Sequence, residues 1–122
     1  MHYAANSQFD KAEILDDGQL KLTGAIFLNG DVNGTNASAI DVGTGTTYLT
    51  SAGAETRTLA DGKENQVKRL VCITYVGNIV VTPTNLVGTT ITFTAAGGAW
   101  EGVFKKGEWI TLSASPASCT VA

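Results

Sequence analysis

The chain has 122 residues, of which 43% are hydrophobic and 16% are charged, and its formal net charge is −3. This length suits one domain, and an apolar fraction of this size can form a core, which excludes a disordered chain. Lys and Arg do not outnumber Asp and Glu, which argues against nucleic acid or an anionic membrane as partner, and no apolar run approaches the roughly 18 residues that cross a membrane.

Residues 1–15 cannot build a core of their own. We therefore expect an extended N-terminal arm that is ordered by a partner. The first residues, MHYAANSQFDKAE, lack the basic start and the apolar centre of a secretion signal. We expect a chain that is made and kept in a cytoplasm.

Residues 16–50 are rich in Gly, Asn and Thr. An Asp-Asp-Gly turn leads into a predicted strand over residues 19–28, whose alternation fails at Gly24-Ala25. Few large apolar residues follow this strand. The segment therefore predicts a long loop, or a pair of strands flattened against something else.

Residues 51–122 show apolar residues at period two with turn residues at short intervals, which is typical of an all-β domain. Turns are predicted at Asp61-Gly62 and Lys105-Lys106-Gly107, and a two-residue hairpin at Gly77-Asn78. The predicted strands cover residues 55–59, 66–76, 79–82, 89–94, 99–104 and 108–113. The expected fold class is all-β: an antiparallel meander that forms a small β-sandwich or barrel, with its core in this segment.

The strand over residues 66–76 is the most apolar of the series. From Leu70 onward both of its faces are apolar, so we expect a central strand that is covered on two sides. Its charged start, with Lys68 and Arg69, is typical of a solvated strand end.

Catalytic residue types are scarce. His2 is the single histidine and stands in the expected arm, so a Ser-His or Cys-His nucleophile has no anchored base. Cys72 and Cys119 are expected to be free thiols, the first of them buried, and with one histidine they are too few for a structural zinc site. We expect no metal and no cofactor.

Two carboxylates could serve glycoside hydrolysis. Glu101 and Glu108 flank the predicted turn near Trp100 and Trp109, and they could face each other across it. Charged residues beside a turn are ordinarily solvated, however, and we expect no enzyme. The stretch that begins at Asp31 favours a turn over a calcium loop, because its glycine comes too early and no glutamate stands at the twelfth position.

Trp100 and Trp109 allow three interpretations. They could form a stacking platform for sugars, anchor a subunit interface, or belong to the core. We expect at least one of them in the core. Trp109 and Ile110 must point to opposite faces of their strand, and an exposed apolar side chain in a charge-poor protein favours a subunit contact.

About half of the chain, residues 55–113, resembles a short β-rich module of structural proteins from tailed bacteriophages, namely capsid decoration proteins, head fibres and tail-fibre segments. The shared pattern is a Leu-x-Asp-Gly turn, Gln-x-Lys, an apolar strand, a Thr-Pro turn, a Gly-Thr-Thr-Ile-Thr-Phe strand, a Gly-rich loop and a closing Trp strand. The residues that carry it here are Leu59, Asp61, Gly62, Gln66, Lys68, Thr82-Pro83, residues 88–93, Gly97-Gly98 and Trp109. The stretch Trp100-Glu101-Gly102 departs from the family, which more often alternates simple apolar residues there.

The resemblance implies a virion structural protein without catalytic activity: a capsid decoration or cement protein that forms a homotrimer and binds the major capsid protein. It implies a place on the capsid surface after synthesis in the host cytoplasm, with neither nucleic acid nor a membrane as partner. The expected capsid contacts are Tyr3, Phe9, Ile14 and Leu15. The expected subunit-interface residues are Trp100, Trp109, Lys68 and Arg69.

The chief alternative is a head-fibre, tail-fibre or adhesin module that binds host glycans through Trp100, Trp109 and the polar loop around Asn33. A third class, a small hydrolase that uses Glu101 and Glu108, would need both carboxylates in one cleft.

Overall fold

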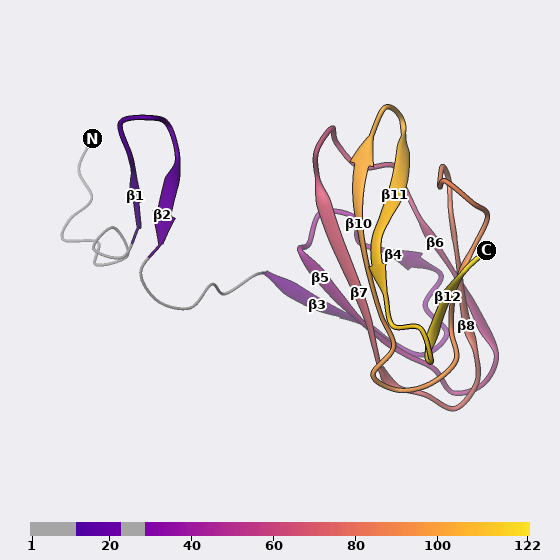
Figure 1. Cartoon of the computed structure of the whole chain (residues 1–122). Coiled ribbons are helices and arrows are strands. Elements are labelled where there is room, and N and C mark those ends of the chain that lie inside the picture. Colours follow the sequence, from indigo (N-terminus) through magenta and orange to yellow (C-terminus); the bar gives the residue numbers. More distant parts are fainter. Residues whose placement is uncertain (1–11, 23–28) are drawn as a thin grey trace.

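The computed structural model describes residues 12–22 and 29–122 of the chain. All regular structure in these ranges is β-strand: two five-stranded sheets pack against each other, and a two-stranded hairpin precedes them in the sequence (Figure 1). The prediction of an all-β sandwich is confirmed, and the sheets do not close into a barrel. In this part of the chain there is no helix long and apolar enough to cross a membrane.

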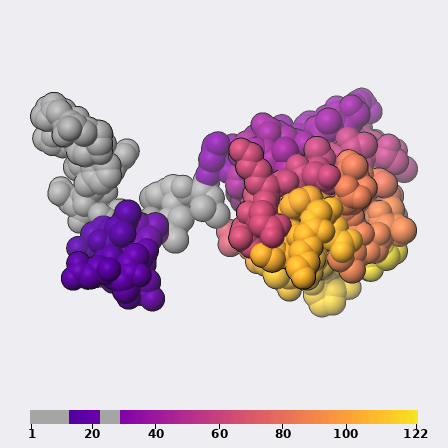
Figure 2. All heavy atoms as spheres, turned by 90° about the horizontal axis from the view of Figure 1, so that it is seen from above, coloured from indigo at the N-terminus to yellow at the C-terminus, as the bar shows by residue number. Residues whose placement is uncertain are grey.

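We call the two sheets of the sandwich sheet I and sheet II. In the order in which they lie, the strands of sheet I are β11 (Glu108–Ala114), β10 (Ala99–Lys105), β7 (Val67–Thr74), β5 (Thr46–Thr50) and β3 (Gly30–Asn33). Those of sheet II are β12 (Cys119–Val121), β9 (Ile91–Phe93), β8 (Ile79–Pro83), β6 (Glu55–Leu59) and β4 (Ala39–Ile40). Figure 2 shows the chain from residue 29 onward as one continuous body.

The hairpin consists of β1 (Ala12–Ile14) and β2 (Leu20–Leu22). Its connection is the predicted Asp-Asp-Gly turn, in which Gly18 has a φ of 86° and donates its amide hydrogen to the carbonyl oxygen of Leu15 at 2.8 Å. Residues 12–15 of the expected arm thus belong to a hairpin. The rest of that arm lies outside the described residues, as does the stretch 23–28 of the strand predicted over 19–28.

The chain crosses from one sheet to the other at every step between β3 and β8. Strands that are neighbours within a sheet are therefore parallel in this half: β3, β5 and β7 in sheet I, and β4, β6 and β8 in sheet II. Every neighbouring pair that includes β9, β10, β11 or β12 is antiparallel. The pairing is thus antiparallel among the later strands, as predicted. β6, β7 and β8, which the sequence pattern predicts to be consecutive strands of a meander, instead lie in alternate sheets and have parallel partners.

The prediction of a hairpin at Gly77-Asn78 is wrong, because the strands on either side, β7 and β8, lie in different sheets. The hydroxyl group of Ser51 holds this crossing: it donates to the carbonyl oxygen of Gly77 at 2.8 Å and accepts from the amide of Val76 at 3.1 Å. A Cβ at position 77 would lie 2.3 Å from a backbone carbon of Gly53. Glycine therefore serves here to let two backbones approach closely, and not to form a turn within a sheet.

The predicted turn between β10 and β11 is confirmed. Lys106 and Gly107 form it with φ angles of 54° and 85°, and Phe104 pairs with Trp109 just beyond it. Trp109 is buried, whereas its neighbour Ile110 is 37% exposed. The two side chains leave the strand on opposite faces, as predicted.

The sandwich begins at Gly30, so its core does not start at residue 51 as expected. The segment 16–50, predicted as a long loop or a flattened pair of strands, supplies β3, β4 and β5. Its large buried apolar residues are Ile40 and Leu49. A segment with so few apolar side chains needs another source of order, and buried polar contacts provide it.

Arg57 on β6 is one of these sources. Its fully buried guanidinium donates from Nη2 to the carbonyl oxygens of Thr50 at 2.8 Å and Gly34 at 3.0 Å, and from Nε to the amide oxygen of Asn33. Its charge is paired with Glu55 at 2.9 Å. A buried cation is tolerated when it is paired and hydrogen-bonded in this way. The side chain thereby joins sheet II to β3 and β5 of sheet I.

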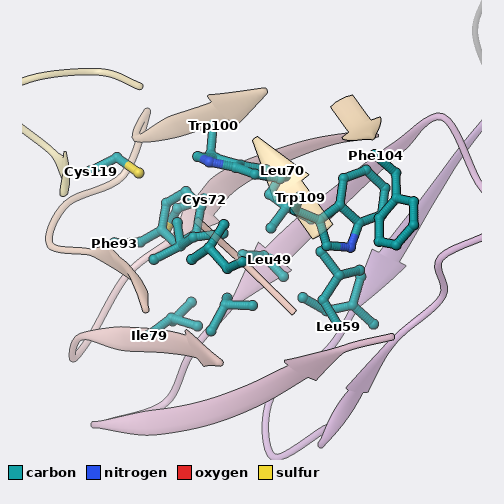
Figure 3. Packing of buried hydrophobic residues seen from close by; sticks show 14 residues of the cluster. Leu49, Leu59, Leu70, Cys72, Ile79, Phe93, Trp100, Phe104, Trp109 and Cys119 are labelled. Atoms are coloured by element: carbon teal, nitrogen blue, oxygen red, sulfur yellow. The ribbon is translucent and has the colours of Figure 1, made fainter. Parts of the chain in front are cut away.

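Aromatic side chains fill one end of the core (Figure 3). The ring of Trp109 packs edge-on against Phe104 and Trp100, with centroid distances of 5.2 and 6.1 Å. Both indole N–H groups have acceptors: that of Trp109 donates to the carbonyl oxygen of Ala60 at 3.0 Å, and that of Trp100 to Thr111 Oγ1 at 2.9 Å.

Cys72 and Cys119 are both free and both buried in this core (Figure 3), which confirms the prediction of free thiols. Burial raises the pKa of the Cys119 thiol to about 11, and it also raises the pKa of Cys72. Because the thiolate is the reactive form, neither residue is a ready nucleophile.

Each tryptophan lies over a glycine. A Cβ at position 102 would be 2.2 Å from an atom of the Trp100 indole, and a Cβ at position 62 would be 2.8 Å from the Trp109 indole. The glycines of the Leu-x-Asp-Gly turn and of the Trp100-Glu101-Gly102 stretch thus make room for the largest side chains of the core.

We expect Gly102→Ala to lower the free energy of unfolding by about 1–3 kcal/mol, because the added methyl group and the Trp100 ring cannot both keep their places. Urea unfolding followed by tryptophan fluorescence measures this change. The matched control is Gly53→Ala, since a Cβ there meets no atom within 4 Å. Equal losses in the two variants would contradict the packing of Trp100 over Gly102.

Candidate interaction surface

The central strand of sheet I, β7, has one covered face and one open face. Lys68, Leu70 and Cys72 point inward and are buried, whereas Val67 and Ile73 point outward and are 45% and 47% exposed. The strand is hydrogen-bonded to neighbours on both sides, as expected for a central strand. The prediction that β7 is covered on both faces is wrong, because the sandwich has two layers and each sheet has one face exposed to solvent.

Strand register arranges the open side of sheet I in rows that run across the strands. The first apolar row consists of Val32 on β3, Tyr48 on β5 and Val71 on β7. Val32 is 62% exposed and Tyr48 is 38% exposed. The ring of Tyr48 lies over Gly30, where a Cβ would be 3.3 Å from the ring.

The second apolar row contains Val67 on β7, Val103 on β10 and Ile110 on β11. Between the two rows stands a polar row, in which Arg69 is paired with Glu101 at 2.5 Å. An exposed ion pair of this kind contributes little to stability. We call these three rows together the outer face of sheet I.

The outer face of sheet II has a different chemistry. Its outward residues are mostly threonines, namely Thr56, Thr58, Thr82, Thr92 and Thr120. Threonine hydroxyl groups are solvated by water. Burial of exposed Val and Ile side chains, in contrast, would be favourable by about 25 cal/mol for each Å² of apolar surface removed from water. Contiguous exposed apolar rows are uncommon on monomeric proteins and mark contact surfaces. The contrast between the two faces identifies the outer face of sheet I as the candidate interaction surface.

Lys68, which is expected at a subunit interface, is instead fully buried. Its ammonium group donates to the carbonyl oxygens of Asp41 and Thr44 and to the hydroxyl oxygens of Thr44 and Thr47, at 2.7–2.8 Å. The carboxylate of Asp31 accepts hydrogen bonds from the same two hydroxyl groups at 2.6 and 2.7 Å. We call these five residues the Lys68 cluster. It ties β7, β5, β3 and the loop before β5 together.

The Lys68 cluster shifts the pKa values of its charged groups. Burial lowers the pKa of Lys68, although the charges of Asp31 and Asp41 oppose this effect. Burial raises the pKa of Asp31, but hydrogen bonds from Thr44 and Thr47 and the charge of Lys68 outweigh it, so the pKa ends below 3.8. Ionised Asp31 therefore contributes stability above its unfolded pKa, and this contribution is lost as the pH falls through the lower folded pKa.

The other expected contact residues are also divided between the core and the outer face of sheet I. Trp100 and Trp109 are 1% and 0% exposed, so they belong to the core and neither can anchor a subunit or stack on a sugar. Asn33 is also buried, with its side chain bonded to Arg57 and to the carbonyl oxygen of Ala39. Of the four residues expected at a subunit interface, Arg69 alone lies on an outer face.

The carboxylates of Glu101 and Glu108 are not brought together. Glu108 pairs with Lys105, which lies four residues along β10 from Glu101, a separation of about 13 Å at 3.3 Å per residue. Glycosidases place their carboxyl groups roughly 5–9.5 Å apart. Within residues 12–22 and 29–122, no three His, Cys, Asp or Glu side chains lie close enough together to hold a metal ion. His2 lies outside the described residues.

The hairpin that precedes the sandwich has one apolar and one charged face. Ile14 pairs with Leu20, and Leu22 shares their face because it lies two residues further along the strand. Glu13 and Lys21 pair on the opposite face, with 3.6 Å between Nζ and the carboxylate. The apolar face is open to solvent, with Ile14 77%, Leu20 63% and Leu22 41% exposed.

The residues expected to contact a capsid lie in or before this hairpin. Ile14 belongs to its apolar face, and Leu15 begins its turn and is 37% exposed. Tyr3 and Phe9 lie outside the described residues.

Comparison of the chain with protein-family models and with curated proteins finds no match. Its function is therefore inferred from the surfaces described above.

The outer face of sheet I is the feature that the sequence alone does not reveal. Alternation along β7 shows two apolar faces and does not show which one the second sheet covers. A usable signal lies in the outward positions of other strands, which hold threonine at Thr56, Thr58 and Thr92 but valine or isoleucine at Val103 and Ile110. Such a contrast indicates which sheet has the open apolar face.

We expect Lys68→Met to lower the free energy of unfolding by about 3 kcal/mol, because it leaves the Asp31 carboxylate and the carbonyl oxygens of Asp41 and Thr44 without their cation. Chemical denaturation at neutral pH measures the loss. The control is Arg69→Met, the next residue, whose exposed ion pair is worth less than about 1 kcal/mol. Adding Asp31→Asn to Lys68→Met should recover part of the loss, and an unchanged or larger loss would contradict the coupling between the two charges.

Proposed function

We propose that this chain is a virion structural protein: a capsid decoration, or cement, protein that forms a homotrimer and binds the major capsid protein. The observation that supports the proposal is the exposed apolar outer face of sheet I, set against the threonine-rich face of sheet II in the same sandwich. The trimeric state and the capsid as partner follow from the resemblance of residues 55–113 to phage decoration modules.

Association of copies through the outer face of sheet I would remove its apolar rows from water. Stable interfaces bury about 800 Å² on each partner, and their centres are poor in charge. The outer face carries one ion pair, Arg69 with Glu101, between its two apolar rows, and the two charges are already paired within a single copy.

The N-terminal segment is the proposed contact with the major capsid protein, with Tyr3, Phe9, Ile14 and Leu15 as its expected contact residues. A protein that binds the assembled lattice, but not free capsid subunits, shifts the assembly equilibrium toward the shell. The chain acts in this way on the capsid surface, after synthesis in the host cytoplasm.

The alternative of a fibre or adhesin module that binds host glycans has less support. Trp100, Trp109 and Asn33, the expected sugar contacts, are all buried. Aromatic stacking needs an accessible ring face, which these residues do not offer.

Val67→Asp places a charge in the second apolar row and should dissociate the trimer. We expect the mass measured by light scattering to fall from that of three chains to that of one, with loss of co-sedimentation with mature capsids of the encoding virus. Circular dichroism checks that the variant is folded.

The control for this experiment is Thr82→Asp, which places the same charge on the outer face of sheet II. It should leave both the mass and the capsid binding unchanged. A wild-type chain that is monomeric at micromolar concentration and does not bind mature capsids would refute the proposed function.

A further inference from the structure

We infer that the β1–β2 hairpin of one copy packs, through its apolar face, on the outer face of sheet I of a second copy. This inference rests on the proposed function, in which copies of the chain associate, and it names the two surfaces that meet. The hairpin contributes Ile14, Leu20 and Leu22, and the second copy contributes its second apolar row, Val67, Val103 and Ile110.

The hairpin needs a surface to cover it. Its two strands have three residues each, and an isolated two-stranded hairpin is marginally stable in water. The ion pair of Glu13 with Lys21 is exposed and stabilises it little. Burial of Ile14, Leu20 and Leu22 is therefore the main source of stability open to it.

The outer face of sheet I has the shape and size that such a hairpin requires. Sheets pack face to face about 10 Å apart, with apolar side chains between them. Five strands at about 4.8 Å spacing span roughly 19 Å, whereas the two strands of the hairpin lie about 4.8 Å apart, so the hairpin covers only part of this face. One hairpin therefore covers one apolar row and leaves its charged face, with Glu13 and Lys21, toward solvent.

Charge selects the second apolar row as the place of contact. The hairpin turn carries Asp16 and Asp17, and the turn between β10 and β11 carries Lys105 and Lys106. Lys105 lies two residues beyond Val103 of the second row. A hairpin that lies on this row with its turn toward the end of β10 brings its two acidic side chains to this basic turn, in which Lys105 is also paired with Glu64 at 3.1 Å.

The hairpin packs on a second copy of the chain, because its apolar face and the outer face of sheet I both remain exposed within a single chain. Within the chain the hairpin forms a sheet of its own, Leu20 remains 63% exposed and Val67 45% exposed. Each copy therefore has one hairpin that can pack on a neighbouring copy and one outer face of sheet I on which the hairpin of another copy can pack. Contacts between unlike surfaces generate a closed ring when the rotation between copies closes, as in a trimer. This assignment places Ile14 between copies and narrows the capsid contact to Leu15 and the residues before the hairpin.

Disulfide trapping between two variants that each carry one added cysteine tests this inference. Chains that carry Leu20→Cys are mixed with chains that carry Ile110→Cys and exposed to a mild oxidant. We expect a disulfide-linked dimer on a non-reducing gel, since Leu20 and Ile110 meet across the contact. The native cysteines, Cys72 and Cys119, are buried and do not compete. Lys21→Cys mixed with Ile110→Cys is the control, and its cross-linking should be lost because Lys21 is on the opposite face of the hairpin.

Two results would overturn the inference. One is the absence of the Leu20–Ile110 cross-link in a mixture whose mass shows that the chains associate, which would leave the proposed function standing. The other is a disulfide within one chain of the double variant Leu20→Cys/Ile110→Cys, since the hairpin would then cover its own sheet. Failure of the wild-type chain to associate or to bind capsids is a different outcome, and it would refute the proposed function itself.

Discussion

The first half of the sandwich depends on two buried cations. Lys68 on β7 and Arg57 on β6 donate to carbonyl oxygens of the segments that cross between the sheets, and each is paired with or lies near a carboxylate. These segments have few large apolar side chains, so charge-assisted hydrogen bonds hold them where packing cannot. Because each cation is satisfied by one particular set of acceptors, the two also determine which loop lies against which strand. The first apolar row of the outer face of sheet I exists because β3, β5 and β7 are held in this register.

Sequence periodicity locates strands well but not their partners. β6 is found at its predicted bounds, residues 55–59, and β7 to β11 begin and end close to the predicted positions, whereas β12 lies where no strand is predicted. Alternation of apolar and polar residues indicates to which face of a sheet each side chain points. This alternation is the same in parallel and antiparallel sheets, so it does not show which strands are neighbours. The crossing at Gly77 therefore resembles a hairpin in the sequence. The strands β3 and β4 escape prediction for another reason, since Arg57 and the Lys68 cluster replace the apolar residues by which a strand is recognised.

The candidate surface could be predicted less well than the fold. Tryptophan is both the commonest anchor of interfaces and a preferred core residue, and composition does not separate the two roles. Here Gly62 and Gly102 decide the matter, because they give the indoles of Trp109 and Trp100 room inside the sandwich. Lys68 is misassigned because lysine is seldom buried, and its four acceptors come from β5 and the loop before it, more than twenty residues away in sequence. The exposed valines and isoleucines, by contrast, are visible in the sequence, but alternation along their own strands does not separate them from core residues.

The path of the chain from β3 to β8 is a coil, in which each turn adds one strand to each sheet. The antiparallel strands β9 to β12 lie beyond β7 and β8 and cap one end of this coil, while β3 and β4 form its other, uncapped end. Coils of this kind gain or lose length in whole turns, because each turn contacts its nearest neighbours alone. Insertion or deletion of a turn ahead of β5 would therefore alter the width of the protein while leaving in place the tryptophan-filled cap and the second apolar row, which spans β7, β10 and β11.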